Sequence, residues 1–221
     1  MRTRERRLGR LGRLAAVAAI GIGLAAGVSA AAAQAGTIVD DWSKVKVGPA
    51  PQLKEVTVDP KTTALLMLDF IPTICNEKVR PRCIASLPAM KQMLERARAA
   101  HATVIFSTAG KATPKDVWAQ VAPLPSEGWV HSHADKFLDT DLEKMLHDKG
   151  IKTVIVVGTA ANGAVLYTGS HAALLGYKVI VPVDGSTAEN EYTEQYVVYN
   201  FAHAPGVSNE TTLTTSAMVK F

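Results

Sequence analysis

The sequence predicts an α/β protein: a three-layer αβα, Rossmann-like fold with a mainly parallel central sheet. Three observations carry this prediction. Short, continuous runs of apolar residues recur along the chain, which is typical of strands buried on both faces. Segments with apolar residues at helical spacing lie between these runs. The two types of segment alternate, and this order favours a parallel sheet with helices on both faces.

The first half of the domain supplies two strands and two helices. TTALLMLDF at 62–70 and ATVIFST at 102–108 are the apolar runs. The segment 87–100 predicts a helix, because its apolar residues are at helical spacing with charged residues between them. A second helix is predicted at 139–150, where an Asp or Thr is a suitable cap and Gly150 ends the pattern.

The second half supplies three more strands and two helices. We expect strands at 152–158, 178–184 and 211–219, and helices at 162–175 and 188–203. Gly176 ends the first of these helices, and Pro182 interrupts the middle strand. In parallel sheets the functional site lies beyond the carboxyl ends of the strands. That rule selects Asp69, residues 108–111, the turn 158–164, and Asp184.

The first 35 residues differ from the rest of the chain. Residues 1–13 contain six Arg and one Glu, and no charged residue follows until Asp40. The run ends in small-x-small triplets, VSA at 28–30 and AQA at 33–35. This pattern predicts a signal peptide at 1–35, followed by an extended arm at 36–60 and one domain at 61–221. A permanent membrane anchor is the alternative.

If residues 1–35 are removed on export, the net charge of the remaining chain and the expected state of its cysteines both change. Residues 1–35 carry six of the 24 basic and one of the 20 acidic residues, so the remainder has 18 basic and 19 acidic residues. We therefore expect no nucleic-acid partner, and membrane contact only through the leader. In an oxidising periplasmic or extracellular space, Cys75 and Cys83 are expected to form a disulfide. The alternative is a free, reactive thiol.

Three segments carry a family resemblance. They are TALLMLDF at 63–70, KFLDTDLEKMLHDKGIKTVIVVGTAANGAV at 136–165, and HAALLGYKVIVPVDGSTAEN at 171–190. In this order they resemble the isochorismatase-like cysteine hydrolases, which include nicotinamidases and N-carbamoylsarcosine amidases. The resemblance implies a triad of Asp, Lys and Cys. It also implies an oxyanion hole of two backbone N–H groups, one beside a non-proline cis peptide.

Carried onto this chain, the triad is incomplete. Asp69 matches the family Asp, and the family's nucleophile turn falls on 158–165. The Cys position is therefore Ala164, whose methyl group cannot attack a carbonyl carbon, so the covalent mechanism is excluded there. The turn backbone is retained, and the resemblance makes Ala160, Asn162 and Gly163 candidates for binding a substrate.

The family Lys is displaced. It lies six residues before the Phe of the following helix, which is Phe137 here, so its position is occupied by His131. Lys136 stands five residues later. Either side chain can supply the positive charge, but for each the favoured interpretation is a solvated loop residue. The family's optional metal motif is absent, and we expect neither a metal nor a cofactor, because His131-x-His133 is a weak signal alone.

Three functions remain open. The first is a hydrolase of altered chemistry, in which Asp69 acts as general base on water or Cys75 supplies a thiol from the neighbouring loop. The second is a pseudoenzyme that binds a small carboxylate, amide or aromatic ring without turnover. The third is a structural exported domain. In each case a small molecule or a second copy of the chain, in a homo-oligomer, is the expected partner.

The leader prediction is testable on protein from the native host. We expect a soluble mature protein that begins near Ala31 or Gly36, because signal peptidase cleaves after the small-x-small triplets. N-terminal sequencing measures the start. An intact Met1 on a soluble cytoplasmic protein would contradict the prediction.

Overall fold

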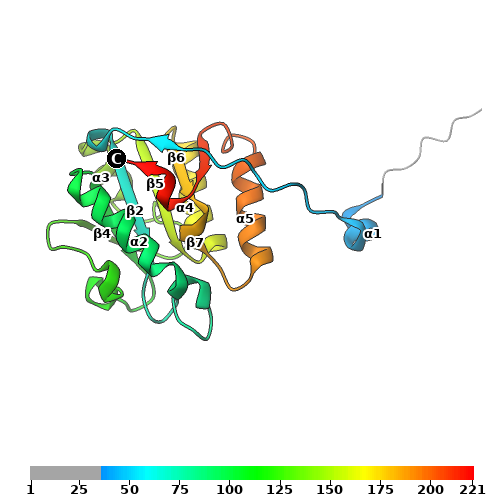
Figure 1. The fold of residues 1–221 in the computed structure, drawn as a ribbon, viewed down its shortest axis with the longest axis horizontal. Helices are drawn as coiled ribbons and strands as arrows, with labels where there is room; N and C mark the ends of the chain where they lie inside the picture. Colours follow the sequence, from blue (N-terminus) through cyan, green and yellow to red (C-terminus); the bar gives the residue numbers. More distant parts are fainter. Residues whose placement is uncertain (1–35) are drawn as a thin grey trace, which may run out of the picture. The chain divides into compact units, whose positions relative to one another are not determined.

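The computed structural model describes residues 36–221, and the predicted signal peptide at 1–35 lies outside the described residues. The described chain falls into two compact units that divide after Gly48. In the first, a helical turn, α1 (Ile38–Asp41), is followed by a 3₁₀ turn, η1 (Trp42–Lys44) (Figure 1). Within the described part of the chain, no helix is both long and apolar enough to cross a membrane.

A seven-stranded sheet, parallel at every pairing, forms the centre of the second unit. Its strands are β2 (Thr63–Leu68), β3 (Thr103–Thr108), β4 (Gly128–His131), β5 (Thr153–Thr159), β6 (Lys178–Pro182), β7 (Ser186–Thr187) and β8 (Thr211–Thr214). The order is β4-β3-β2-β5-β6-β8, with β7 paired to β5. A separate parallel pair joins β1 (Val56–Thr57) to β9 (Val219–Lys220). The predicted parallel α/β fold is confirmed.

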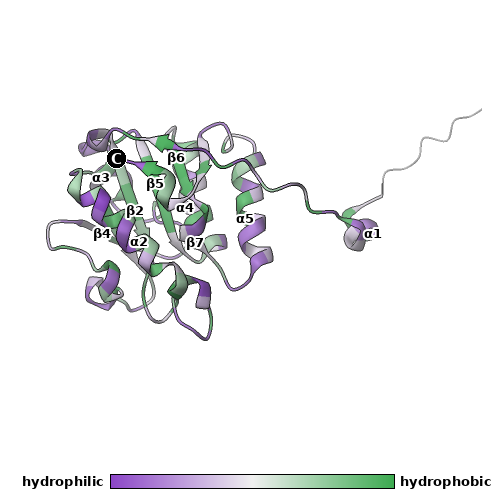
Figure 2. Ribbon diagram, viewed as in Figure 1, coloured by the Kyte–Doolittle hydropathy of each residue, from purple (hydrophilic) through white to green (hydrophobic). Residues whose placement is uncertain are grey.

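Helices cover both faces of the sheet. The helix α2 (Pro81–Ala99) packs on one face, and α3 (Leu142–Asp148), α4 (Leu166–Leu174) and α5 (Glu191–His203) pack on the other (Figure 1). Five 3₁₀ turns connect these elements: η2 (Pro60–Thr62), η3 (Pro114–Asp116), η4 (Ala119–Val121), η6 (Val183–Gly185) and η7 (Ser216–Met218). Figure 2 shows apolar strands and helices of mixed hydropathy. This is the expected pattern when helices bury one face and expose the other.

The strand β2 fixes the geometry of the site. All six of its residues are buried, and it pairs with β3 on one side and β5 on the other. Leu68, its last residue, is in register with Ser107 and with Gly158. Because the three strands are parallel, the residues after Leu68, at Ser107 and after Gly158 meet at one edge.

The structure corrects several boundaries. The short edge strand β4 was not predicted, because it pairs with β3 only and GWVH has no strand-length apolar run. The helix α2 starts at Pro81, six residues before the prediction, and contains Pro88. The predicted final strand at 211–219 is broken by η7 into β8 and β9. The second unit also includes part of the stretch predicted as an arm, because the Lys54 N–H donates to the Leu213 carbonyl at 3.0 Å.

The predicted disulfide is present. Cys75 and Cys83 are bonded, with 5.4 Å between their Cα atoms, and the described chain contains no free cysteine. The bond ties the loop after β2 to the first turn of α2, and both cysteines are fully buried. Cys75 therefore supplies no thiol, and that variant of the hydrolase hypothesis is wrong.

The disulfide is expected to stabilise the domain. Replacing both cysteines with Ser should lower the free energy of unfolding by about 2–3 kcal/mol, because the oxidised loop restricts the unfolded chain. Denaturant unfolding of the oxidised wild type and the double variant measures the difference. Thiol titration of the unfolded, unreduced wild type should find no free thiol. Two free thiols would contradict the bond.

Candidate active site

Asp69 lies directly after β2 in a constrained backbone conformation. Its φ is 56°, in the left-handed region that residues other than glycine seldom adopt. The side chain is almost completely buried, with 3% of the residue exposed. The Ser107 hydroxyl, from the end of β3, donates to Oδ1 at 2.7 Å. The register of β2 and β3 therefore places the Asp69 carboxylate next to the Ser107 hydroxyl.

Lys136 supplies the charge that balances Asp69. It is fully buried, and its Nζ donates to Asp69 Oδ2 at 2.7 Å. The remaining donors of Nζ turn back to the loop's own backbone, to the carbonyls of His133 and Ser132. Of the two candidate cations, the displaced lysine is therefore the one that contacts the carboxylate. Its description as a solvated loop residue is wrong.

His131 lies at the outer edge of the same region. It ends β4 and is exposed, and its Nδ1 is 3.2 Å from the Thr108 hydroxyl. That hydroxyl donates its proton to the Ala112 carbonyl at 2.8 Å and accepts from Trp129 Nε1 at 3.1 Å. Because Thr108 has one hydroxyl proton, donor and acceptor in its contact with Nδ1 depend on the tautomer of the His131 ring.

The environment of Asp69 moves its pKa in opposing directions. Burial raises the pKa above its ordinary value, because the charged form loses hydration. Lys136, the Ser107 hydroxyl and the more distant His131 lower it. The net direction is upward, which favours a carboxylate that can take up a proton.

The turn after β5 forms the other wall. Gly158 has a φ of 149°, and an added Cβ would stand 2.2 Å from the Leu68 carbonyl oxygen, so the close approach of β5 to β2 requires glycine here. The Thr159–Ala160 peptide is cis. A π-helical turn, η5 (Ala161–Val165), then leads into α4. The Ala160 carbonyl accepts from the N–H groups of Gly163 and Val165.

The predicted binding residues occupy different environments on this turn. Ala164 is buried, with 3% exposed, whereas Asn162 is exposed and Gly163 is intermediate. Ala134, from the loop that carries Lys136, packs over Gly163: a Cβ added there would be 3.9 Å from the Ala134 Cβ. The loop of the lysine and the turn of Ala164 are therefore neighbours.

Two further residues near strand ends, Asp184 and Ser107, have roles that differ from those expected from the sequence. Asp184 accepts hydrogen bonds from the Ser216 N–H and hydroxyl at 2.7 and 2.6 Å, so it fastens η6 to η7. Ser107 was not singled out from the sequence, although a polar residue near the end of an apolar strand was an available signal. Among residues 36–221, no three His, Cys, Asp or Glu side chains gather as a metal site would require.

A known protein family matches most of the chain. The isochorismatase domain matches residues 63–212, which is most of the chain. The chain belongs to the isochorismatase domain family. The strand, loop and turn that carry Asp69, Lys136 and Ala164 all fall within the matched domain.

Two curated relatives are similar to this chain in sequence. A secreted isochorismatase effector of Verticillium dahliae is 27% identical over 142 residues, covering 58% of this chain and 74% of the relative. Streptothricin hydrolase of Streptomyces noursei is 28% identical over 157 residues, covering 66% of this chain. The chain spans 58% of the length of that hydrolase.

Solved isochorismatase-like structures have the same fold. A cysteine hydrolase from Pseudomonas syringae superposes with a TM-score of 0.66 at 19% identity, covering 76% of this chain and 95% of that one. The nicotinamidase of Staphylococcus aureus gives 0.63 at 19% identity, with 70% and 99% coverage. N-carbamoylsarcosine amidase from Thermoplasma acidophilum gives 0.60 at 20% identity, with 70% and 96% coverage.

Removing one partner of the buried ion pair should have a measurable cost in stability. Lys136→Met should lower the free energy of unfolding by about 3–5 kcal/mol at neutral pH, because it leaves the Asp69 charge buried and unpaired. The pKa of Asp69, already raised, should rise further. The contribution of Asp69 to stability should then be greatest below its ordinary pKa of 3.8 and be lost as pH rises through the folded-state pKa.

Denaturant unfolding across pH measures both effects. Adding Asp69→Asn to Lys136→Met removes the unpaired charge and should remove this pH dependence. A Lys136→Met protein as stable as wild type at neutral pH would show that the two side chains are not paired.

Proposed function

We propose that the mature protein hydrolyses a small amide or a related C–N or C–O bond without a covalent enzyme intermediate. The single observation that carries this proposal is the buried Asp69–Lys136 ion pair, at 2.7 Å, beside a nucleophile turn whose thiol is replaced by a methyl group. An ion pair of this kind costs desolvation energy and adds little net stability. Its presence at the strand ends is better explained by chemistry than by folding.

In the proposed reaction, water replaces the thiol. Asp69 accepts one proton as the water oxygen attacks the carbonyl carbon, and the negative charge that develops on the carbonyl oxygen is stabilised by backbone N–H groups of Ala160 and Ala164. The C–N or C–O bond then breaks. The proton held by Asp69 passes to the leaving nitrogen or oxygen, and the carboxylate is regenerated. Lys136 holds Asp69 in place throughout.

The raised pKa of Asp69 supports its role as a base. A carboxylate at its ordinary pKa is a weak proton acceptor, and burial makes this one stronger. His131 supports binding at the edge of the site, because it is exposed and an imidazole can donate or accept a hydrogen bond. A substrate amide is a suitable partner for that ring.

The setting proposed for this activity is outside the cytoplasm. The basic and apolar pattern of residues 1–35 and the Cys75–Cys83 bond support export, and one relative is described as a secreted effector. The substrate is therefore expected in the periplasm or outside the cell. The leader is the only proposed contact with a membrane.

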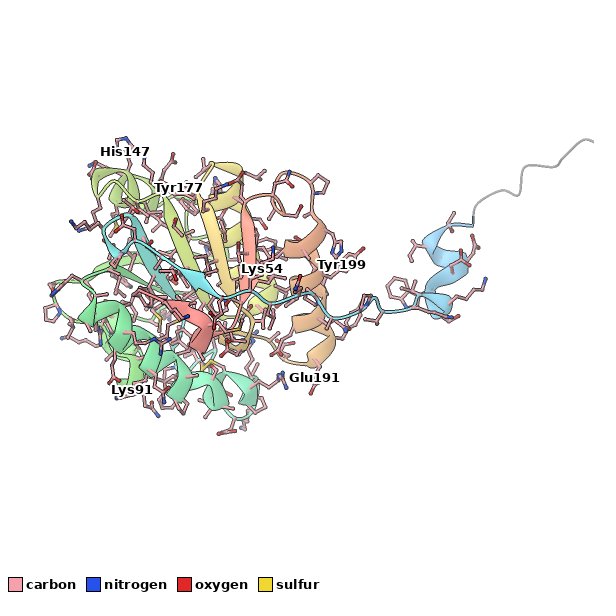
Figure 3. The ribbon with its side chains drawn as sticks, turned by 45° about the horizontal axis from the view of Figure 1, so that its top comes forward. Lys54, Lys91, His147, Tyr177, Glu191 and Tyr199 are labelled. Carbon is pink, nitrogen blue, oxygen red and sulfur yellow. A yellow bond between two sulfur atoms is a disulfide. The ribbon has the colours of Figure 1, made fainter. Side chains whose placement is uncertain are left out.

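The proposal also includes a homo-oligomer, as expected from the sequence. Three large aromatic side chains on α5 are exposed: Tyr192, Tyr196 and Tyr199. Figure 3 shows Tyr199 and Glu191 on α5. An exposed aromatic stripe of this kind is compatible with a contact between copies.

Binding without turnover is the second candidate. Ala164 favours it, because the change removes the family's nucleophile while the rest of the turn and the charged pair remain. Such a protein would hold a small carboxylate or amide against the turn and the Lys136 loop.

One experiment separates the two functions. Mature wild type and Asp69→Asn are mixed with a panel of small aromatic and aliphatic amides and carboxylates, and both binding and product release are measured. The proposed hydrolase should release product, and Asp69→Asn should slow release by at least about a hundredfold, as expected for loss of a general base. Binding without product in wild type would establish the second candidate. Neither binding nor product across the panel would contradict both.

A further inference from the structure

The loop that carries Lys136 is closed on itself. The Ser132 hydroxyl lies 2.9 Å from the Asp135 carbonyl oxygen and 3.0 Å from that of Leu138. The Lys136 ammonium group contacts the carbonyls of Ser132 and His133 from the inside. These contacts lie within residues 132–138, so they fix the conformation of the loop but not its position relative to the rest of the protein.

Beyond the ion pair with Asp69 and the Ser132 N–H, which donates to the Thr108 carbonyl at 3.3 Å, the loop is attached to α4. The Lys136 N–H donates to the Thr168 hydroxyl at 3.1 Å, and His171 Nδ1 is 2.8 Å from Asp135 Oδ2. Thr168 and His171 are three residues apart and so lie on one side of the helix. Asp135 and Lys136 are therefore held by adjacent turns of the same helix.

Besides His171, the Asp135 carboxylate binds the backbone next to Lys136. Its Oδ1 accepts the Phe137 N–H at 3.0 Å, so the carboxylate spans Lys136 from the residue before it to the residue after it. The Phe137 ring packs on the His171 ring, with 4.9 Å between centroids. Asp135 and His171 thus hold the backbone on both sides of Lys136.

The helix α4 also begins at the turn that contains Ala164. One rigid element therefore carries the candidate active-site turn at its start and the anchors of the lysine loop further along. This arrangement sets the distance between the loop and the turn.

We propose that Asp135 and His171 are positioning residues: they hold the Lys136 loop against α4, so that the displaced lysine reaches Asp69 beside the Ala164 turn. The inference rests on the proposed function in one respect, which is that Lys136 serves that site. It adds two residues that neither the family resemblance nor the fold assigns.

A thiol placed at Ala164 reports the position of the lysine. The described chain has no free cysteine, so in Ala164→Cys the new thiol is the only described group that iodoacetamide should alkylate rapidly. Its pKa, read from the alkylation rate across pH, falls when a cation is near and rises when the cation leaves. No substrate is needed, so the result is independent of whether the wild type hydrolyses or binds anything.

His171→Ala in the Ala164→Cys background should raise the thiol pKa by about one unit. Alkylation at neutral pH should slow by about tenfold. Asp135→Ala should have the same effect, and the double variant should go no further, because the two side chains act as one contact. His171→Asn should restore part of the rate, since its amide N–H can replace Nδ1. His203→Ala is the matched control: His203 is exposed, stacks on Tyr199 of α5, and its removal should leave the pKa unchanged.

A second set of variants shows whether His171→Ala changes the thiol pKa by moving Lys136. With Lys136→Met and Asp69→Asn both present, His171→Ala should no longer shift the thiol pKa. A shift that persists there would overturn the proposal, and so would an unchanged pKa in the first background.

A second measurement covers the case in which the cysteine variants do not fold. In ¹⁵N-labelled protein with Ala at 164, the Lys136 ammonium group should give a slowly exchanging NMR signal, because it is buried and hydrogen-bonded. His171→Ala should accelerate its exchange by at least about tenfold, whereas His203→Ala should not. Equal exchange in wild type and His171→Ala would overturn the proposal.

Discussion

The ion pair between Asp69 and Lys136 is the constraint on which the rest of the site depends. Both side chains are withdrawn from water, and each is costly to bury without the other. The remaining polar atoms of the pair are therefore occupied: Ser107 contacts one carboxylate oxygen, and two backbone carbonyls surround the ammonium group. A pair satisfied in this way resists rearrangement, and it fixes the distance between the end of β2 and the loop after β4.

The backbone next to the ion pair adopts unusual conformations. Asp69 adopts a positive φ, and Gly158 allows β5 to approach β2 where a Cβ would collide with the Leu68 carbonyl. Conformations of this kind persist when the surrounding structure holds them. The disulfide adds a covalent tie between the loop after Asp69 and α2. The positive φ of Asp69 and the close approach at Gly158 both lie at the carboxyl ends of strands, at the candidate site.

We propose that Ala164 stands where the family resemblance implies a cysteine, and this assignment separates two contributions that a cysteine hydrolase combines. The charged pair and the turn would provide electrostatics and geometry, while a thiol would provide the covalent bond. In the proposed site only the first contribution is present, and the chain has the fold of the isochorismatase domain. Water is the simplest nucleophile that such a site can use, and a tightly bound ligand is the simplest alternative to a reaction.

The sequence by itself determined the layers and the parallel strands, and it predicted the edge of the sheet at which the candidate site lies. Apolar runs and helical spacing are local signals, and they correctly located β2, β3, β5 and β6. Through the family resemblance it also predicted Asp69 and Ala164 as site residues, and both remain predictions. The pairing of Cys75 with Cys83 followed from the compartment that the leader predicts.

Only the tertiary structure decided which cation reaches Asp69. Counting residues along the chain placed His131 at the family position, but a loop can deliver an ammonium group from a different position when its backbone folds back. Lys136 does so because Thr168 and His171, more than thirty residues later, hold its loop. Contacts between segments so far apart in the chain leave no periodic pattern in the sequence, and so the lysine's role was open until the fold brought α4 beside it.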